Sequence, residues 1–406
     1  MTPDHKFDVA VVGAGVFGAW TAYQLRRTGA EVLLVDAYGP GNSRASSGGE
    51  SRIIRMGYGP EAIYTRLAQR SLTLWLELFD HLNRPQLFQR TGVLWLAGEN
   101  DSYCDATLKT FQQNKVQFER LERSELGRRY PQLELGPISW GVLEPESGIL
   151  LARQAVKAVV AEARAVGVKY LEAAIRPLKT GDDGKRGTQK GDGAEGLYES
   201  GAATLESITT ISDRQISANK FVFACGPWLP KLFPELLADL IHVTRQEVFF
   251  LGVPAGDDRF NPPRMPTWMD INELVYGIPN LDNRGFKIAI DAHGPQFDPD
   301  TGDRIVSPES VNAVRAYLAR RVPLLADAPV TESRVCQYEN TSNGDFLIDR
   351  HPEFENAWLV GGGSGHGFKH GPAVGEHVAA LVSGSARVEL RFALATKRKA
   401  QQRKVF

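Results

Sequence analysis

The feature that most constrains the fold is a glycine turn between an expected strand and an expected helix. Gly13, Gly15 and Gly18 form the pattern GxGxxG directly after the apolar run 9–12, and Asp36 ends the next apolar run about twenty residues later. In such a turn the first glycine permits the tight bend, the second lets the backbone approach a diphosphate, and the third lets helix and strand pack. The pattern predicts a βαβ unit that binds a dinucleotide at a helix N-terminus, with Asp36 accepting hydrogen bonds from a ribose. The turn does not distinguish FAD from NAD.

A chain of 406 residues is too long for one ordinary core, so two domains are expected. The remaining sequence alternates helical patterns with β-rich runs, which favours an α/β and α+β fold in which a Rossmann-like domain and a sheet-based domain interleave. We expect residues 1–82, 143–230 and 335–406 to form the dinucleotide-binding domain. Residues 83–142 and 231–334 are expected to form the substrate domain.

The composition narrows the possible partners. A formal net charge of −1 gives no basic excess for nucleic acid or anionic lipid, so a small-molecule ligand is expected. No stretch approaches the roughly 18 apolar residues of a membrane helix, and the N-terminus lacks a basic export signal. An odd number of distant cysteines (Cys104, Cys225 and Cys336) suits a reducing compartment. These features predict a cytoplasmic protein, and we expect no metal site.

A second motif, residues 46–55, combines hydroxyl groups with two arginines. Arg52 and Arg55 lie three residues apart, and their forked guanidinium groups suit a carboxylate or a flavin carbonyl. The alternative is that both arginines are solvated surface residues.

A third motif is the glycine-rich run 361–371, which follows an expected buried strand and precedes a helix starting at Pro372. So many glycines indicate unusual dihedral angles or close contact between the backbone and a flat ligand. The following helix could stabilise negative charge on a reduced flavin, and Lys369 could hold a substrate carboxylate there. The alternative is a flexible linker.

Taken together, these motifs resemble the monomeric sarcosine oxidase family, which includes N-methyltryptophan, pipecolate and fructosyl amino acid oxidases. Four segments carry the resemblance, in the same order as in the family: the glycine turn with Asp36, the run 51–55, the runs 276–279 and 285–287, and the stretch from Cys336 to Lys369. The resemblance implies FAD as the cofactor, with a thioether from Cys336 to the flavin 8-methyl group. Without the resemblance, Cys336 would read as an inert buried thiol.

The resemblance also implies residue roles. Arg55 and Lys369 would clamp the substrate carboxylate, Arg52 would lie near the flavin ring, and Lys287 would activate oxygen. The expected catalytic residues are Lys287, Arg52, Arg55, Lys369, Tyr276 and Tyr338. The expected cofactor-binding residues are Gly13, Gly15, Val16, Phe17, Gly18, Asp36, Ala37, Ser46, Ser51, Arg52, Ile175, Cys336, Gly363, Gly365, His366, Gly367, Phe368 and Lys369. From the bare sequence, Lys287 could equally be a surface lysine, and Tyr276 and Tyr338 could be core residues.

The implied activity is oxidation of the C–N bond of a small secondary amino acid that is N-methylated, cyclic or N-glycated. O2 would reoxidise the reduced flavin and give hydrogen peroxide, and the imine would hydrolyse to an aldehyde or ketone. We expect a monomer. Three alternatives stay open: a dehydrogenase that passes electrons to a carrier or quinone, a non-catalytic flavin-binding or nucleotide-binding redox sensor, and a plain NAD dehydrogenase. The last is disfavoured because the glycine run 361–371 would have no cofactor to contact.

Two departures from the family matter. Gly48 stands where sarcosine oxidases carry a histidine, and Ile278 replaces an aromatic residue, so a roomier pocket is expected. The low-complexity stretch 181–203 is longer than the family's usual connection, and we expect it to be an exposed loop.

Overall fold

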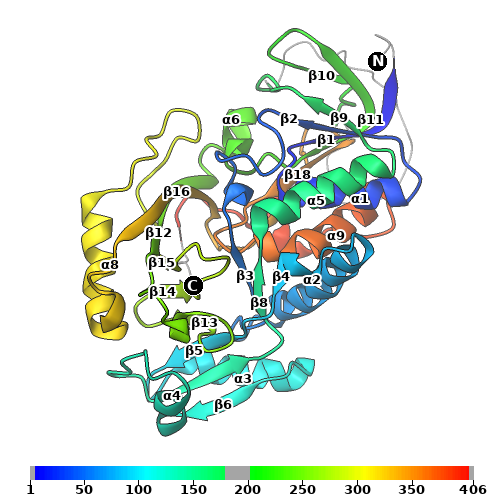
Figure 1. Ribbon diagram of the computed structural model, residues 1–406. Coiled ribbons are helices and arrows are strands. Elements are labelled where there is room, and N and C mark those ends of the chain that lie inside the picture. The colour runs from blue at the N-terminus through cyan, green and yellow to red at the C-terminus, as the bar shows by residue number, and fades with distance from the viewer. Residues whose placement is uncertain (1–4, 179–201, 402–406) are drawn as a thin grey trace. The chain divides into compact units, whose positions relative to one another are not determined.

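The computed structural model describes residues 5–178 and 202–401 (Figure 1). Within this part, the chain divides into two compact units that alternate along the sequence. The first unit comprises the chain up to Glu50, then Ala152–Val243, and then the chain from Tyr338 onward; the second comprises Ser51–Leu151 and Thr244–Gln337. The predicted mixed fold class is confirmed. Of the predicted loop 181–203, residues 181–201 lie outside the described residues.

The boundaries of the units differ from those expected: residues 51–82, 143–151 and 335–337 belong to the second unit and residues 231–243 to the first. The physical reason for the first two differences is a small antiparallel sheet of three strands. These are β3 (Arg52–Ile54), β8 (Gly148–Leu150) and β4 (Phe88–Gln89), in that order. Their backbone hydrogen bonds hold both segments in the second unit.

The first unit is built on a seven-stranded sheet. Its strands, in order across the sheet, are β17 (Leu347–Arg350), β18 (Ala357–Gly361), β11 (Gln215–Phe223), β1 (Lys6–Val12), β2 (Val32–Asp36) and β9 (Lys169–Glu172), with β10 (Ser207–Thr209) paired to β11. The pairs from β18 to β9 are parallel, so the carboxyl ends of these strands meet at one edge. Ligands of open parallel sheets bind outside such an edge.

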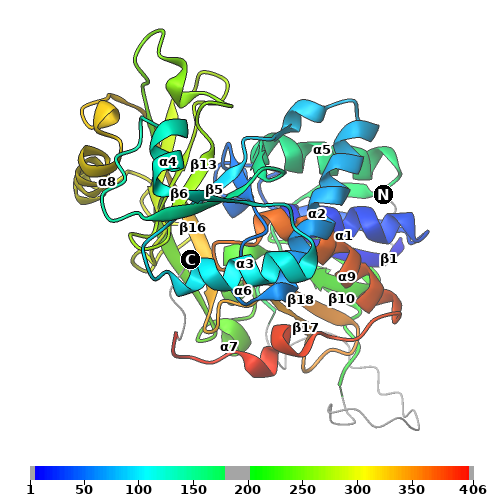
Figure 2. The ribbon, with the colours of Figure 1, turned by 90° about the horizontal axis from the view of Figure 1, so that it is seen from below.

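Helices cover this sheet. They are α1 (Val16–Arg27), α5 (Ala152–Ala165), α9 (Gly371–Ser383) and the short α6 (Leu229–Leu232) and α7 (Pro234–Leu237). Helix α1 lies between α5 and α9 and packs against both (Figure 1), and Figure 2 shows α1 beside α9 from below. Since β1 and β2 are parallel and joined by α1, the predicted βαβ unit is present. Its strands carry the continuous apolar runs 9–12 and 32–35, because both faces of a parallel sheet are buried.

Most of the second unit is an eight-stranded sheet. In order across it lie β16 (Val330–Thr341), β12 (Ile241–Leu251), β15 (Phe286–Ile290), β14 (Val275–Ile278), β13 (Thr267–Asp270), β5 (Val93–Ala97), β7 (Trp140–Glu144) and β6 (Glu119–Glu122). The helices of this unit are α2 (Ala62–His81), α3 (Ser102–Asn114), α4 (Arg123–Arg129) and α8 (Pro308–Arg321).

The two faces of the large sheet carry different side chains, because successive residues of a strand point to opposite sides. One face packs in an apolar core with α8, through residues such as Phe286, Ile288 and Leu318. The other face carries a cross-strand row in which Tyr276 pairs with Met269, and Met269 with Trp95. The candidate residues of β14 and β15 therefore lie on the face opposite the α8 core.

In the described part of the chain, no helix is long and apolar enough to cross a membrane. The same residues contain no group of three or more His, Cys, Asp or Glu side chains arranged to hold a metal ion.

Candidate active site

The glycine turn after β1 has the geometry that its sequence predicts. Gly13 has φ +104°, in the left-handed region that favours glycine, and a Cβ there would lie 2.3 Å from the carbonyl oxygen of Ala224. A Cβ on Gly18 would lie 1.8 Å from the carbonyl oxygen of Gly13. Both positions therefore require glycine, and Gly15, the N-cap of α1, has no side chain to cap the helix.

Asp36, the last residue of β2, contacts the backbone of this turn. Its Oδ2 accepts a hydrogen bond from the Ala14 amide at 2.7 Å, and its Oδ1 accepts from the Tyr38 amide at 2.9 Å. Burial raises the pKa of Asp36, while these two hydrogen bonds oppose the rise. A carboxylate has about four acceptor sites, so Asp36 can hold the turn and still accept from a hydroxyl group.

Ser47 also contributes to the turn, although the sequence analysis selected its neighbour Ser46. The Ser47 hydroxyl is buried and accepts a hydrogen bond from the Val16 amide at 3.1 Å. This donor is one of the first amides of α1, so Ser47 satisfies part of the helix N-terminus. The adjacent pair of serines was the available signal, but the sequence alone did not tell which hydroxyl faces the helix.

The glycine run 361–371 forms a structured loop at the carboxyl end of β18. Gly362 and Gly365 have φ +67° and +80°, and a Cβ on Gly365 would lie 2.7 Å from the ring of Tyr338. Lys369 is buried, and its Nζ donates to the carbonyl oxygen of His366 at 3.0 Å. The His366 ring stacks on Phe346. The linker alternative is wrong, because this loop is ordered by its own contacts.

A carboxyl group that the sequence analysis missed supports the same loop. Glu339 is buried, and its Oε1 accepts from the Gly363 amide at 3.2 Å. Its Oε2 is buried and has no hydrogen-bond partner among the described residues. Burial raises the pKa of Glu339 to about 7, although the amides of Gly363 and Gly362 oppose that rise.

In the second unit, β3 places Arg52 beside Cys336. The guanidinium donates through Nη2 to the Cys336 sulfur at 3.4 Å and through Nη1 to the Ser51 carbonyl oxygen at 2.9 Å. Cys336 is partly exposed and carries no disulfide. It is therefore not the fully buried thiol of the alternative, and its reaction with FAD stays a prediction.

Arg55 is the most distinctive residue of the second unit. Its side chain is 3% exposed, and its guanidinium carbon lies 4.4 Å and 4.8 Å from the ring centroids of Tyr58 and Trp95. Its Nη1 donates to the carbonyl oxygen of Gly57. Among the described residues, no carboxylate forms an ion pair with Arg55. The solvated-arginine alternative is thus wrong for Arg55, which is a buried cation between aromatic rings.

The guanidinium of Arg55 is positively charged. Burial lowers the pKa of Arg55, but nearby tyrosines and two carboxylates raise it, and the net shift is upward. The two carboxylates are Glu144 and Asp291. Arg55 therefore keeps its charge, and a buried charge with no ion-pair partner among the described residues attracts an anionic ligand strongly.

Lys287 is a second buried cation on the same unit. It is 2% exposed, and its Nζ donates to the Ser51 carbonyl oxygen at 3.1 Å and to the Ser51 hydroxyl at 3.2 Å. Its Nζ lies 5.8 Å and 5.9 Å from the ring centroids of Phe250 and Tyr276. The surface-lysine alternative is wrong. Burial raises the pKa of Tyr276, so its hydroxyl stays protonated beside this cation.

Comparison with known proteins agrees with this geometry. The family described as FAD dependent oxidoreductase matches residues 8–381. The chain belongs to this family. A monomeric sarcosine oxidase of Bacillus sp. (strain B-0618) is 32% identical over 92% of this chain and 92% of that protein. An N-methyl-L-tryptophan oxidase of Salmonella heidelberg (strain SL476) is 27% identical over 93% of this chain and 95% of that protein. The predicted relationship to the monomeric sarcosine oxidases is confirmed.

A solved structure shows the same fold. L-proline dehydrogenase from P. horikoshii has a TM-score of 0.78 and 20% identity, and the match covers 96% of this chain and 97% of that one. The chain is thus an FAD-dependent oxidoreductase of the sarcosine oxidase type, a class that acts on CH–NH donors. NAD as the sole cofactor is excluded by the family.

The first unit of this FAD-dependent oxidoreductase fits the dinucleotide. A side chain at Gly13 or Gly18 would strike the backbone that forms the tight turn before α1, and Asp36 keeps acceptor sites for a ribose. Ile175 forms an isolated β-bridge with Thr210. The two hydrogen bonds of this bridge are made by the residues on either side, so the bridge does not use the backbone groups of Ile175 itself. The expected contacts of all predicted cofactor-binding residues with FAD, including those of Ala37, Ser46, Gly367 and Phe368, stay predictions.

Gly48 does not provide the extra room that its small size suggested. A Cβ there would lie 1.7 Å from the carbonyl oxygen of Asn42, so the neighbouring backbone already fills the space. Its carbonyl oxygen accepts from Arg153 at 2.8 Å and 3.0 Å. The prediction of a roomier pocket therefore rests on Ile278 alone.

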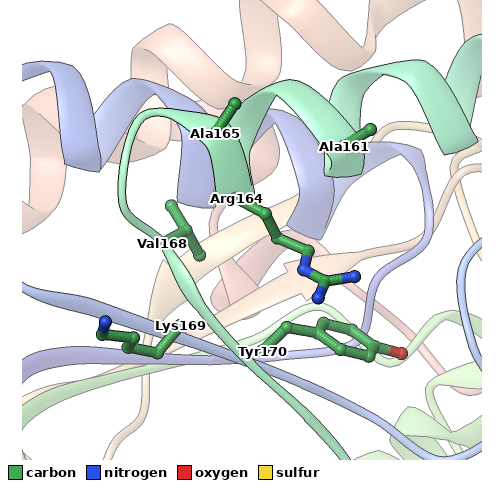
Figure 3. Close-up of a pocket in the computed structure, with 6 residues that line it drawn as sticks. All are labelled: Ala161, Arg164, Ala165, Val168, Lys169 and Tyr170. Atoms are coloured by element: carbon green, nitrogen blue, oxygen red, sulfur yellow. The ribbon is translucent and has the colours of Figure 1, made fainter.

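The first unit also has a surface hollow that none of these residues lines. It has a volume of about 570 Å³ and lies between α5 and β9 (Figure 3). The residues that line it are Ala161, Arg164, Ala165, Val168, Lys169 and Tyr170. None of them is a predicted site residue, so the hollow is not the candidate active site.

Proposed function

We propose that this FAD-dependent oxidoreductase is an oxidase of small secondary amino acids, N-methylated, cyclic or N-glycated, that uses O2 and gives an imine and hydrogen peroxide. The names of its relatives support this substrate class: sarcosine oxidase, N-methyl-L-tryptophan oxidase and fructosyl peptide oxidase. FAD, when bound, supplies the chemistry: it accepts a hydride equivalent from the substrate and is reoxidised by O2.

The observation that carries the proposal is the buried cation Arg55. A permanently charged guanidinium that lies over the rings of Tyr58 and Trp95, with no ion-pair partner in the described part of the chain, is suited to bind a carboxylate in two parallel hydrogen bonds. Every proposed substrate carries such a carboxylate. Arg55 would thereby orient the substrate, and orientation contributes much of the rate in such reactions. Lys369 is a further proposed carboxylate ligand.

We propose that Lys287 acts in the reaction with O2. Its ammonium is held by two oxygen atoms of Ser51 in a buried, partly aromatic setting. A fixed cation lowers the free energy of a negative charge that forms on O2, and more so where water is excluded. Tyr276 and Tyr338 are proposed to line the substrate pocket.

Three finer points belong to the same proposal. Cys336 is proposed to bind FAD covalently, which its partial exposure allows. The protein is proposed to be a monomer, as the names of its bacterial relatives suggest. A cytoplasmic location is proposed from three cysteines without disulfides.

A substrate screen tests the proposal. Purified protein is mixed with N-methylglycine, N-methyltryptophan, pipecolate, proline and fructosyl glycine, and both flavin bleaching without air and peroxide formation in air are measured. Bleaching by at least one of them, followed by peroxide formation, is the expected result. A flavin that stays oxidised with all five would overturn the proposed function, and bleaching without peroxide would indicate a dehydrogenase.

The role of Arg55 has its own test. Arg55→Lys keeps the charge but loses the forked geometry, so KM for the best substrate should rise about 10- to 100-fold, the range of a lost charged hydrogen bond. Arg90→Lys is the matched control, because Arg90 is exposed and pairs with Glu146 at 3.1 Å. Equal KM values in both variants would contradict the role of Arg55.

A further inference from the structure

The buried carboxylate Glu144 contacts the backbone of Met56 and Gly57, the two residues that follow Arg55. It ends strand β7, is 1% exposed, and accepts four hydrogen bonds. Oε2 accepts from the Met56 amide at 2.7 Å and from the Ser147 hydroxyl, and Oε1 accepts from the Gly57 amide at 3.0 Å and the Trp95 indole at 2.7 Å. A carboxylate has about four acceptor sites, so Glu144 is saturated.

The donors to Glu144 include the groups that shape the surroundings of Arg55. The amides of Met56 and Gly57 immediately follow Arg55, and Gly57 in turn accepts a hydrogen bond from the Arg55 guanidinium. The third donor, Trp95, lies with its ring over the guanidinium. One carboxylate therefore fixes both the backbone turn that carries the cation and an aromatic ring that covers it.

The packing of this cluster also explains a glycine. A Cβ on Gly57 would lie 2.5 Å from the Trp95 ring and 3.0 Å from Glu144 Oε1. Any larger residue would push the indole or the carboxylate away, and the hydrogen bonds between them would be lost. The sequence Arg55-Met56-Gly57 is thus fitted to Glu144 by shape as well as by hydrogen bonding.

Glu144 balances the charge of Arg55 without occupying its hydrogen-bond donors. Its negative charge favours the charged form of Arg55, yet it makes no ion pair with the guanidinium. Its four acceptor sites are already taken by other donors, so moving to Arg55 would break hydrogen bonds in a buried place. Glu144 therefore stabilises the charge of Arg55 without a direct hydrogen bond to it, and the Nη1 of Arg55 donates to the Gly57 carbonyl oxygen instead.

We infer that Glu144 is the positioning residue of Arg55: it holds the guanidinium in place and leaves its donors available to the carboxylate of the substrate. This inference rests on the proposed function of Arg55. It predicts that Glu144 acts on the affinity for carboxylates and has little effect on the chemical step.

Glu144→Gln tests the inference with almost no change in size. An amide NH2 would face at least one of the N–H donors from Met56, Gly57 or Trp95, so the turn should shift. Acetate is the probe, and its binding is followed by the flavin absorbance of the holoenzyme. The dissociation constant for acetate should rise about 10- to 100-fold. KM for the best substrate should rise likewise, while the limiting rate of flavin reduction at saturation changes less than about threefold.

Two further variants make the result decisive. Glu146→Gln, two residues along and exposed beside Arg90, is the control and should bind acetate as the unchanged protein does. Trp95→Phe keeps a ring over Arg55 but removes one donor to Glu144, and it should weaken acetate binding severalfold. If Glu144→Gln loses its FAD, Trp95→Phe carries the test, and unchanged acetate binding in it would overturn the inference.

The failure of the inference can be told apart from the failure of the proposed function. Arg55→Met removes the guanidinium itself. If Arg55→Met weakens acetate binding but Glu144→Gln does not, Glu144 is not a positioning residue and the role of Arg55 stands. If neither variant changes acetate binding, Arg55 does not bind the carboxylate.

Discussion

The carboxyl group of Glu339 should make the folded protein less stable as the pH rises. Its ordinary pKa is 4.5, and burial raises the pKa to about 7 in the folded chain. Between these values the folded state binds more protons than the unfolded state, so the free energy of unfolding falls as the pH increases. The pKa rises by about 2.5, and one pKa unit corresponds to about 1.36 kcal/mol, so the free energy of unfolding should fall by about 3 kcal/mol over this pH range. Glu339→Gln removes this titration but keeps an oxygen that can accept from Gly363.

The measurement compares the thermal unfolding of the holoenzyme and of Glu339→Gln at pH 5 and pH 8. Other titrating groups are common to both proteins and cancel in the difference. We expect the melting temperature of the variant, relative to that of the unchanged protein, to be several degrees higher at pH 8 than at pH 5. Glu353→Gln, an exposed position nearby in sequence, is the control. A difference that is the same at both pH values, or that has the opposite sign, would refute the reasoning.

Two further predictions concern the second unit. Lys287→Met keeps the length of the side chain but removes its charge, so flavin reoxidation by O2 should slow by about 100-fold or more while anaerobic reduction by substrate is kept; equal reoxidation rates would remove the assigned role. Cys336→Ser should release the yellow colour into the supernatant after acid precipitation, whereas the unchanged protein should keep it in the pellet. Colour that stays in the pellet of the variant would place the covalent bond elsewhere.

The dinucleotide unit could be predicted because its signals are local. The positive φ of Gly13 and the contact of a Gly18 Cβ with the Gly13 carbonyl oxygen both lie within one βαβ turn, and the Asp36 position follows from the length of one helix and one strand. Such features are encoded within about thirty residues of sequence. The same applies to the glycine run after β18, which has a strand before it and a helix after it.

The surroundings of the candidate cations could not be predicted from the sequence. The ring of Trp95 lies over the Arg55 guanidinium, and Glu144 accepts hydrogen bonds from the two amides that follow Arg55. These two residues come from strands β5 and β7, far along the chain. Glu144 lies in a stretch without any motif, and only the pairing of β7 with β5 brings it beside Trp95. The unit boundaries near residues 51 and 151 differ from those expected for the same reason, since the pairing of β3 with β8 is a long-range contact.

The two buried cations of the second unit, Lys287 and Arg55, differ in their surroundings. Lys287 is a compact ammonium whose donors are directed to the two Ser51 oxygens, so it is a fixed point charge. Arg55 is a planar fork between two aromatic rings, and the nearby carboxylate Glu144 is saturated by other donors. A point charge suits a charge that appears during the reaction, and an open fork suits a carboxylate that is present from the start. Exchanging the residue types should therefore have separate effects: Lys287→Arg should slow flavin reoxidation and Arg55→Lys should weaken substrate affinity, although both variants keep the charge.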